Sequence, residues 1–429
     1  MPPGFRYFEL VDDRTGRYVF WEVAITGTVL ELRHGPVGTP GKHERETCAS
    51  ESLAQHEYQL RVDAHLAEGY REVADRRLDA RTRALEAAIE ADLDDATSYM
   101  VYADWIETLG DARGSLINAQ LAAETDPEAA PRAAAFLKQH EALFLGPLAE
   151  HVGYDGAVIE PTWRYGFIRK AKVTVREQFH PTPASVFHAL LEHPSARWLD
   201  ELVIATADNT SDIKALVDVL AWTARPSLRS LEIGEVGERA DPARDDDPHY
   251  WRRESADLSR LWTAVRGLRR LVIKGDPERL GSLALPRLAH FEIHAQELSA
   301  DDIDAIASAA SPLERLELRF RWPLGPDLAE SLRPIFDGPL IRGLDHLAVT
   351  GVHRTHLAGT DGVCAAIARI PRPALRTLDL SHGQMTDAGA ELLAASRLDL
   401  EIVDVSKNQL SYRGVTALDR IAKLVINDH

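Results

Sequence analysis

The sequence predicts an α/β protein in three parts: a small α+β domain at residues 1–77, a helical spacer at 78–155, and an α/β solenoid with parallel strands at 156–429. Three observations lead to this prediction. The first part alternates apolar and polar residues with the period of a strand. The second repeats its apolar residues at helical spacing. A pattern L-x-x-L-x-[LIV] then recurs along the rest of the chain.

The N-terminal part contains three candidate strands, FRYFELVDD, RYVFWEVAI and TVLELRHG, which are separated by turn residues. A glycine-rich segment, HGPVGTPGK, follows at 34–42. A helix capped by Ser50 and ended by Gly69 is expected next. Its predicted apolar positions are Leu53, Tyr58, Leu60, Val62 and Leu66.

The segments FWEV, LELRHGPVGTPGK and GYREV resemble the WGR domain, which is known from poly(ADP-ribose) polymerases and from bacterial proteins. This resemblance implies a module that contacts DNA ends or neighbouring domains. The name-giving Trp-Gly-Arg triplet is changed, because the chain reads His34-Gly35-Pro36 at this point. Arginine offers phosphate a two-pronged donor, whereas proline has neither a charge nor a backbone N–H.

Four residues of this part are candidates for a phosphate contact: Arg33, His34, Lys42 and Arg45. Residues 1–77 nevertheless hold ten Lys and Arg against thirteen Asp and Glu, and the whole chain has a net charge of −18. Both values oppose attraction to a phosphate backbone. Nucleic-acid binding is therefore possible but disfavoured, and a structural module docked on its neighbour is the preferred interpretation.

The spacer predicts one helix with Leu85, Ala88, Ile89 and Leu93 on its apolar face. A second helix begins near 95–98 and ends at Gly110, and Asp111 is placed to cap the next helix. Its expected buried seam consists of Tyr99, Tyr102, Trp105, Ile106 and Leu109.

The stretch LEAAIEADLDDATSYMVYADWIETLGDARGSLINAQ resembles a bacterial repeat-companion domain, which usually precedes repeat regions. The resemblance implies no chemistry, and we expect this part to cap the repeat array, together with an alanine-rich helix at 131–145. Paired carboxylates do acid–base chemistry only where they converge in a cleft. We therefore interpret Asp104, Glu107, Asp111 and Arg113 as structural, with Asp111 and Arg113 in a capped turn with a local ion pair.

The copies LDLSHGQMTDAGAELLAAS and VDVSKNQLSYRGVTALDR resemble leucine-rich repeats of the ribonuclease-inhibitor type, in which a short parallel strand alternates with a helix. A single repeat cannot bury its leucines, but stacked neighbours share a continuous core. Residues 156–429 are therefore expected to form a leucine-rich-repeat arc. Its strand patterns are LDELVI, LRSLEI, LRRLVI, LAHFEI, LERLEL, LDHLAV, LRTLDL, DLEIVDV and IAKLVI, and GFIRKAKVTV is a degenerate first copy.

In each copy, the residue between the last two core positions should face the concave side of the arc. The row formed in this way consists of Val203, Glu232, Val272, Glu292, Glu317, Ala348, Asp379, Asp404 and Val425, and its same-face neighbours include Arg270 and Lys274. A concave surface of mixed charge beside an aromatic side chain suits recognition of a protein partner. The alternative is charge pairing on a solvated sheet face. The predicted partner-binding residues are His290, Glu292, His294, Arg315, Glu317, Arg319, Arg321 and Trp322.

No catalytic residue, cofactor or metal ligand is predicted. The two cysteines, Cys48 and Cys364, are far apart, and the histidines lack the spacing of known zinc motifs. His353 and His356 lie in a predicted loop near His346, where solvated side chains are expected. No glycine-rich nucleotide motif or nucleophile elbow stands where a strand meets a helix.

The sequence has no run of 18 apolar residues and no pattern typical of a secretion signal at its start, so we expect a cytoplasmic protein without a membrane partner. The leading hypothesis is a non-enzymatic interaction protein that captures a protein partner of unknown identity. The alternative is a nucleic-acid sensor that binds DNA or RNA ends through its N-terminal domain. An enzyme without a recognisable motif is the third hypothesis.

Overall fold

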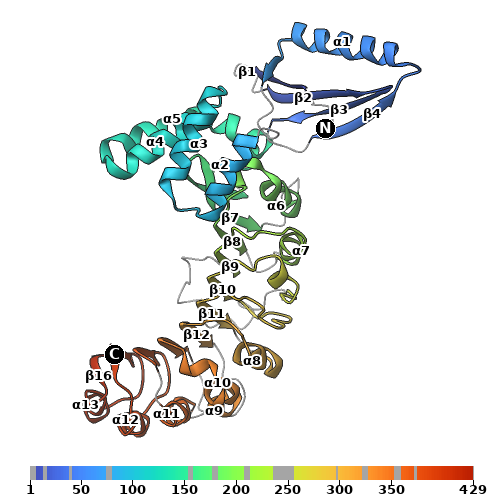
Figure 1. Ribbon diagram of the computed structural model, residues 1–429. Helices are drawn as coiled ribbons and strands as arrows, with labels where there is room; N and C mark the ends of the chain where they lie inside the picture. Colours follow the sequence, from blue (N-terminus) through green and yellow to red (C-terminus); the bar gives the residue numbers. More distant parts are fainter. Residues whose placement is uncertain are drawn as a thin grey trace. The chain divides into compact units, whose positions relative to one another are not determined.

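The computed structural model divides into two compact units, and each is treated by itself (Figure 1). Unit 1 comprises Met1–Ala171 and Ser185–Leu199, and unit 2 comprises Lys172–Ala184 and Asp200–His429. The structure describes residues 6–12, 17–37, 41–73, 80–152, 158–175, 182–206, 213–234, 256–295, 298–320, 327–351, 359–371 and 374–428.

The N-terminal domain is a five-stranded sheet in the order β4-β3-β2-β1-β5, and each neighbouring pair is antiparallel. The three predicted strands are confirmed as β1, β2 and β3, the first three strands along the chain. One face buries Phe8, Trp21, Val23, Leu30 and Leu32. The strands are β1 Arg6–Asp12, β2 Arg17–Thr26, β3 Val29–Pro36, β4 Lys42–Thr47 and β5 Arg71–Val73.

Helix α1, Glu51–Ala67, begins where expected, because Ser50 accepts a hydrogen bond from the Leu53 N–H. Its predicted apolar face is largely wrong. Ala54, Tyr58 and Val62 pack against the sheet at four-residue spacing. The helix therefore presents Ala54, Tyr58 and Val62 inward, and its three leucines lie on its other sides. The exposed fractions of Leu53, Leu60 and Leu66 are 44%, 50% and 44%.

The spacer contains the helices α2 Ala80–Ala91, α3 Ala96–Thr108, α4 Ala112–Thr125 and α5 Ala130–Leu145. The predicted stop and cap are confirmed. Gly110 has a φ of +79°, which lets the chain leave α3, and Asp111 accepts a hydrogen bond from the Arg113 N–H at 2.9 Å to start α4.

The predicted seam of α3 packs within unit 1 on an aromatic cluster. Strands β6, Ile159–Arg164, and β7, Phe167–Val175, follow the helices, and Phe167 opens β7. Trp198 lies with its ring centroid 4.3 Å from that of Phe167 and 5.7 Å from that of Tyr99. The buried members of this core are Ile89, Leu93, Tyr99, Tyr102, Ala103, Ile106, Ile117, Tyr165, Phe167 and Trp198.

The repeat strands follow one another in chain order from β6 to β16, and β7 runs from unit 1 into unit 2. The described pairs from β8 to β16 are all parallel, as the repeat pattern predicts. The remaining strands are β8 Glu201–Thr206, β9 Ser230–Gly234, β10 Arg270–Lys274, β11 His290–Ala295, β12 Arg315–Phe320, β13 His346–Thr350, β14 Thr377–Asp379, β15 Leu400–Asp404 and β16 Ala422–Ile426.

The described helices of unit 2 lie along one side of this sheet, and none of them covers its other side, which we call the open face (Figure 1). Parallel strands need a crossover of this kind, and its apolar side chains complete the core between the two layers. The helices are α6 Pro183–Glu192, which spans both units, α7 Lys214–Trp222, α8 Ala300–Ala307, α9 Leu328–Ser331, α10 Arg333–Asp337, α11 Thr360–Ala368, α12 Asp387–Ala394 and α13 Tyr412–Leu418. Among the described helices, none has both the length and the apolar character that crossing a bilayer requires.

The predicted concave row is confirmed up to its last member. Each residue from Val203 to Asp404 pairs with the next one in register. The final strand is shifted by one residue, so Asp404 pairs with Ile426, while Val425 pairs with Val403. Ala422, not Ile421, aligns with Leu400, and the predicted core residue Leu424 is exposed. The fold class is thus the predicted one: an antiparallel N-terminal sheet, helices, and a mostly parallel α/β repeat sheet.

Candidate interaction surface

Two adjacent strands, β11 and β12, bring the described partner-binding candidates together on the open face of the sheet. In register, His290 pairs with Arg315, Glu292 with Glu317, and His294 with Arg319. Alternation along each strand puts all six on one face, since every second residue points the same way. Arg321 and Trp322, the last two predicted members, lie outside the described residues.

The centre of this surface is a pair of carboxylates on neighbouring strands. Like charges directly opposite each other destabilise a sheet unless cations offset them. Arg319 donates to Glu317 at 2.8 Å, and its Nε lies 3.5 Å from a carboxylate oxygen of Glu292. Arg315 donates to Glu317 at 3.2 Å. The two arginines therefore hold the carboxylates in place.

The same network extends to strand β10. Arg270 lies 3.7 Å from Glu232 and 3.8 Å from Glu292, so it bridges two carboxylates of the central row. Lys274 pairs with Glu232 at 2.5 Å. Basic side chains thus flank an acidic row on both sides.

Three imidazoles border the carboxylates. His294 Nε2 lies 2.5 Å from Glu292, and His290 Nε2 lies 3.5 Å from Glu317. His346 Nε2 lies 3.8 Å from the same Glu317 oxygen as His290. Sequence reasoning did not assign His346 to this surface, although it occupies the position in its repeat that Arg315 occupies in the preceding one. We call the central ion-pair cluster the set Arg270, His290, Glu292, His294, Arg315, Glu317, Arg319 and His346.

The cluster sets the ionisation of its own members. The neighbouring His290 imidazole, followed by Arg319 and Arg315, lowers the pKa of the Glu317 carboxyl. His294 lowers the pKa of Glu292 in the same way. Burial, with help from the Arg315 guanidinium, lowers the pKa of His346. At neutral pH the surface therefore contains two ionised carboxylates, three guanidiniums and a neutral His346.

The N-terminal candidates are not gathered into one patch. Arg45 pairs with Glu31, which lies two residues before Arg33 on β3, and Arg33 pairs with Glu22 on β2. Side chains two residues apart on a strand point the same way, so Arg33 and Arg45 share a face of the sheet. His34 and Lys42 pair with each other and point to the opposite face.

Each of these four side chains also lies beside a carboxylate. Arg33 donates two hydrogen bonds to the buried Glu22, at 2.7 and 2.9 Å. Lys42 and His34 lie 2.6 and 3.6 Å from Glu44. Arg45 lies 3.9 Å from Glu31. Paired in this way, the four side chains have little positive charge to offer a phosphate.

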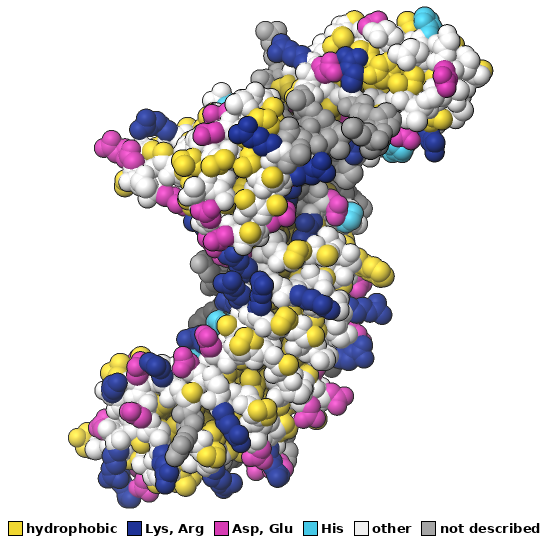
Figure 2. Space-filling model, in the orientation of Figure 1, with side chains coloured by type: hydrophobic (Ala, Val, Ile, Leu, Met, Phe, Trp, Pro, Cys, Tyr) yellow, Lys and Arg dark blue, Asp and Glu magenta, His cyan; other side chains and the backbone are white. Residues whose placement is uncertain are grey.

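Among the described residues, Figure 2 shows the distribution of the other charges on one face of unit 2. In the view of Figure 2, basic and acidic side chains are interspersed along unit 2. Surfaces of this type favour specific contacts over broad attraction to a polyanion.

The fold and this surface define a protein with an N-terminal module, helices and a repeat sheet, and the comparisons with known proteins agree. Residues 4–77 match the WGR domain, and residues 373–394 match a leucine-rich repeat. The two families fit a role in protein interaction or nucleic-acid binding.

The chain was also compared with solved structures and with curated proteins. One similar solved structure is a crystal structure of a protein from Bacteroides fragilis, with 16% sequence identity and a TM-score of 0.43, covering 99% of this chain and 95% of that one. A comparison with curated proteins finds no match.

Proposed function

We propose that this chain is a non-enzymatic interaction protein that captures a protein partner on the open face of its repeat sheet, around the central ion-pair cluster. One observation carries the proposal. Seven strands from β8 to β14 place their outward side chains in continuous register, and mixed charges concentrate on β10 to β13. Repeat sheets of this kind act as extended binding surfaces.

The exposed arginines are the best candidates for contact. Glu317 is buried by its partners, whereas about half of the side-chain surface of Arg315 and Arg319 remains accessible. Arginine is enriched among residues that dominate binding energy, because its planar fork forms several hydrogen bonds at once. A partner would therefore meet the guanidiniums before the carboxylates.

The test is a native pull-down with the full-length chain, with and without nuclease. The full chain is needed because Ser185–Leu199 belongs to unit 1, so a fragment starting at 156 would divide that unit. We expect Arg315→Gln and Arg319→Gln to reduce recovery of the partner by about tenfold, the loss typical of an important interface residue. Nuclease should have no effect.

The control is Arg333→Gln, which neutralises a guanidinium on the helical side, where Arg333 pairs with Glu330 and Asp337. Its partner recovery should equal that of the wild type. Equal recovery with Arg315→Gln and Arg319→Gln would contradict the proposal for this surface.

The second candidate function is binding of DNA or RNA ends through the N-terminal domain. The match of residues 4–77 to the WGR family favours it. Partners that disappear after nuclease treatment, together with unchanged recovery by the two arginine variants, would support this candidate instead.

A further inference from the structure

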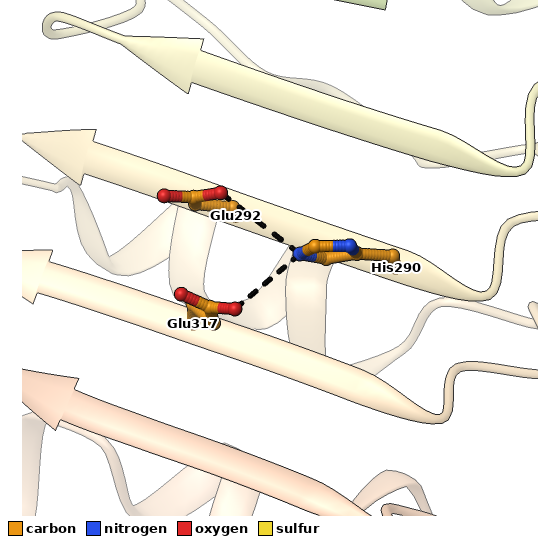
Figure 3. A group of neighbouring side chains, drawn as sticks. All are labelled: His290, Glu292 and Glu317. Atoms are coloured by element: carbon orange, nitrogen blue, oxygen red, sulfur yellow. Dashed lines mark ion pairs between the residues drawn. The ribbon is translucent and has the colours of Figure 1, made fainter. Parts of the chain in front are cut away.

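The central ion-pair cluster contains a group of side chains with the composition of a metal site. His290 and Glu292 lie two residues apart on β11, and Glu317 lies opposite Glu292 on β12. One ligand atom from each of the three lies within 4.8 Å of the others. Figure 3 shows the His290 ring directed between the two carboxylates. In the described part of the chain, this is the group of three or more such side chains that a metal ion could bridge.

Two imidazole nitrogens beside these carboxylates make no hydrogen bond. The Nε2 atoms of His290 and His346 are both buried from solvent without such a partner in the described structure. A buried polar atom that lacks a hydrogen bond is costly, so its presence calls for an explanation. Both atoms lie close to one oxygen of Glu317, at 3.5 and 3.8 Å.

The ring of His346 is also held in position through its other nitrogen. Its Nδ1 lies 2.6 Å from the hydroxyl oxygen of Thr377. If Nδ1–H donates to Thr377, the lone pair of Nε2 faces Glu317. Histidines that bind metals are held in this way, with the second ring nitrogen donating to a neighbour.

The spacing of the atoms is close to that of a coordination shell. Zinc–nitrogen and zinc–oxygen bonds of about 2.1 Å in a tetrahedron separate neighbouring ligand atoms by about 3.4 Å. His290 Nε2 lies 3.5 Å from Glu317 and 3.9 Å from Glu292. Small side-chain movements would therefore suffice to close the shell.

The guanidiniums oppose a cation at this place. Arg315 donates to the same Glu317 oxygen that faces His290, and Arg319 occupies the other. A metal ion would have to displace Arg315 from that oxygen and would sit near two further guanidiniums, those of Arg319 and Arg270. The site should therefore bind more weakly than a dedicated zinc site, and removal of Arg315 should strengthen it.

We propose that His290, Glu292 and Glu317 bind one divalent transition-metal ion, with His346 as the fourth ligand. Imidazole and carboxylate donors together suit Zn²⁺, Co²⁺ or Ni²⁺. Motif analysis predicted no metal site, because it looks for ligands close together in one segment. Here the ligands come from three neighbouring strands, and only the register brings them together.

The test is a calorimetric titration of the full-length chain with ZnCl₂, after removal of metal with a chelator. The wild type should bind one equivalent of Zn²⁺ more tightly than its surface histidines bind further zinc ions. His290→Ala and Glu317→Gln should weaken that equivalent at least tenfold. Arg315→Gln should tighten it, and His188→Ala, on the exposed side of α6, should leave it unchanged.

A titration with Co²⁺ gives a second readout, because a protein-bound, low-coordinate Co²⁺ ion absorbs visible light far more strongly than the hydrated ion does. The melting temperature of each variant without metal shows whether it folds. His290→Ala is expected to fold, because the His290 side chain is only partly buried. Zinc affinity that is the same in the wild type and in folded His290→Ala would overturn the proposal. A wild type that binds zinc no better than the background would do so as well.

Discussion

At the scale of single residues, His193 shows how burial couples folding to pH. Its side chain is 4% exposed, and its Nδ1 accepts a hydrogen bond from the Ser195 N–H at 3.1 Å. Burial, followed by the Arg113 guanidinium, lowers the pKa of His193 to about 4. The folded chain therefore holds this histidine neutral at a pH where the unfolded chain, with a pKa of 6.5, protonates it.

The stability that His193 contributes should be complete above pH 6.5 and should disappear as the pH falls toward 4. The shift corresponds to about 3 kcal/mol of unfolding free energy over this range. In His193→Asn, an amide oxygen can accept the Ser195 bond, but the side chain does not titrate. Denaturant unfolding of both proteins between pH 7 and 4.5 measures the effect. Stability of the wild type should fall more steeply on acidification, and parallel curves would show that His193 does not titrate as argued.

Single residues also show what could be read from the sequence. Alternation along a strand was enough to predict that Glu292, Glu317 and Asp379 share a row, since the repeat pattern fixes the face. It was not enough for Val425, because the last copy aligns one residue later than its leucine pattern indicates. In the N-terminal domain, proximity in sequence suggested one group of cations, but strand alternation divides it between two faces.

At the scale of elements, the sequence predicted where helices begin and end better than it predicted how the helices pack. Asp95, Asp111 and Gly110 act where capping rules place them, because these effects depend on a few neighbouring residues. The role of Arg113 could not be predicted in this way. Its guanidinium donates to Gly166 and to Ser195, which lie 53 and 82 residues further along the chain.

Arg113 therefore joins α4 to the segments around β7 and Trp198 within unit 1. It also lies over the rings of Phe144 and Phe167, at 5.0 and 4.8 Å from their centroids. Arg113→Met keeps much of the apolar stem but loses the charge-assisted hydrogen bonds. We expect it to reduce the free energy of unfolding by about 3 kcal/mol.

Chemical denaturation followed by circular dichroism measures this loss. Arg132→Met, at an exposed position of α5, is the matched control and should change stability by less than about 0.5 kcal/mol. A similar small change in Arg113→Met would contradict the joining role. The predicted capping of the repeat array by these helices stays a prediction.

At the scale of the whole molecule, charge bears on the choice between the two candidate functions. The net charge of −18 repels a polyanion at long range, and no excess of cations in residues 1–77 offsets it. Families with a phosphate-binding module usually gain most of their affinity from unpaired Lys and Arg side chains. Residues 4–77 match the WGR domain, but the candidate cations there lie beside carboxylates.

We therefore expect the full-length chain to bind a blunt-ended DNA duplex no more tightly than about 10 µM at physiological salt, within the range of non-specific contacts. Fluorescence anisotropy of a labelled duplex between 50 and 200 mM salt measures this affinity. Lys42→Ala should change it little, because Glu44 already offsets the ammonium, and Arg33→Ala should act mainly on stability by leaving the buried Glu22 without its partner. Submicromolar, salt-dependent binding that weakens in folded Lys42→Ala would mean that the carboxylates release their cations to phosphate. The N-terminal domain, and not the repeat sheet, would then be the main working surface.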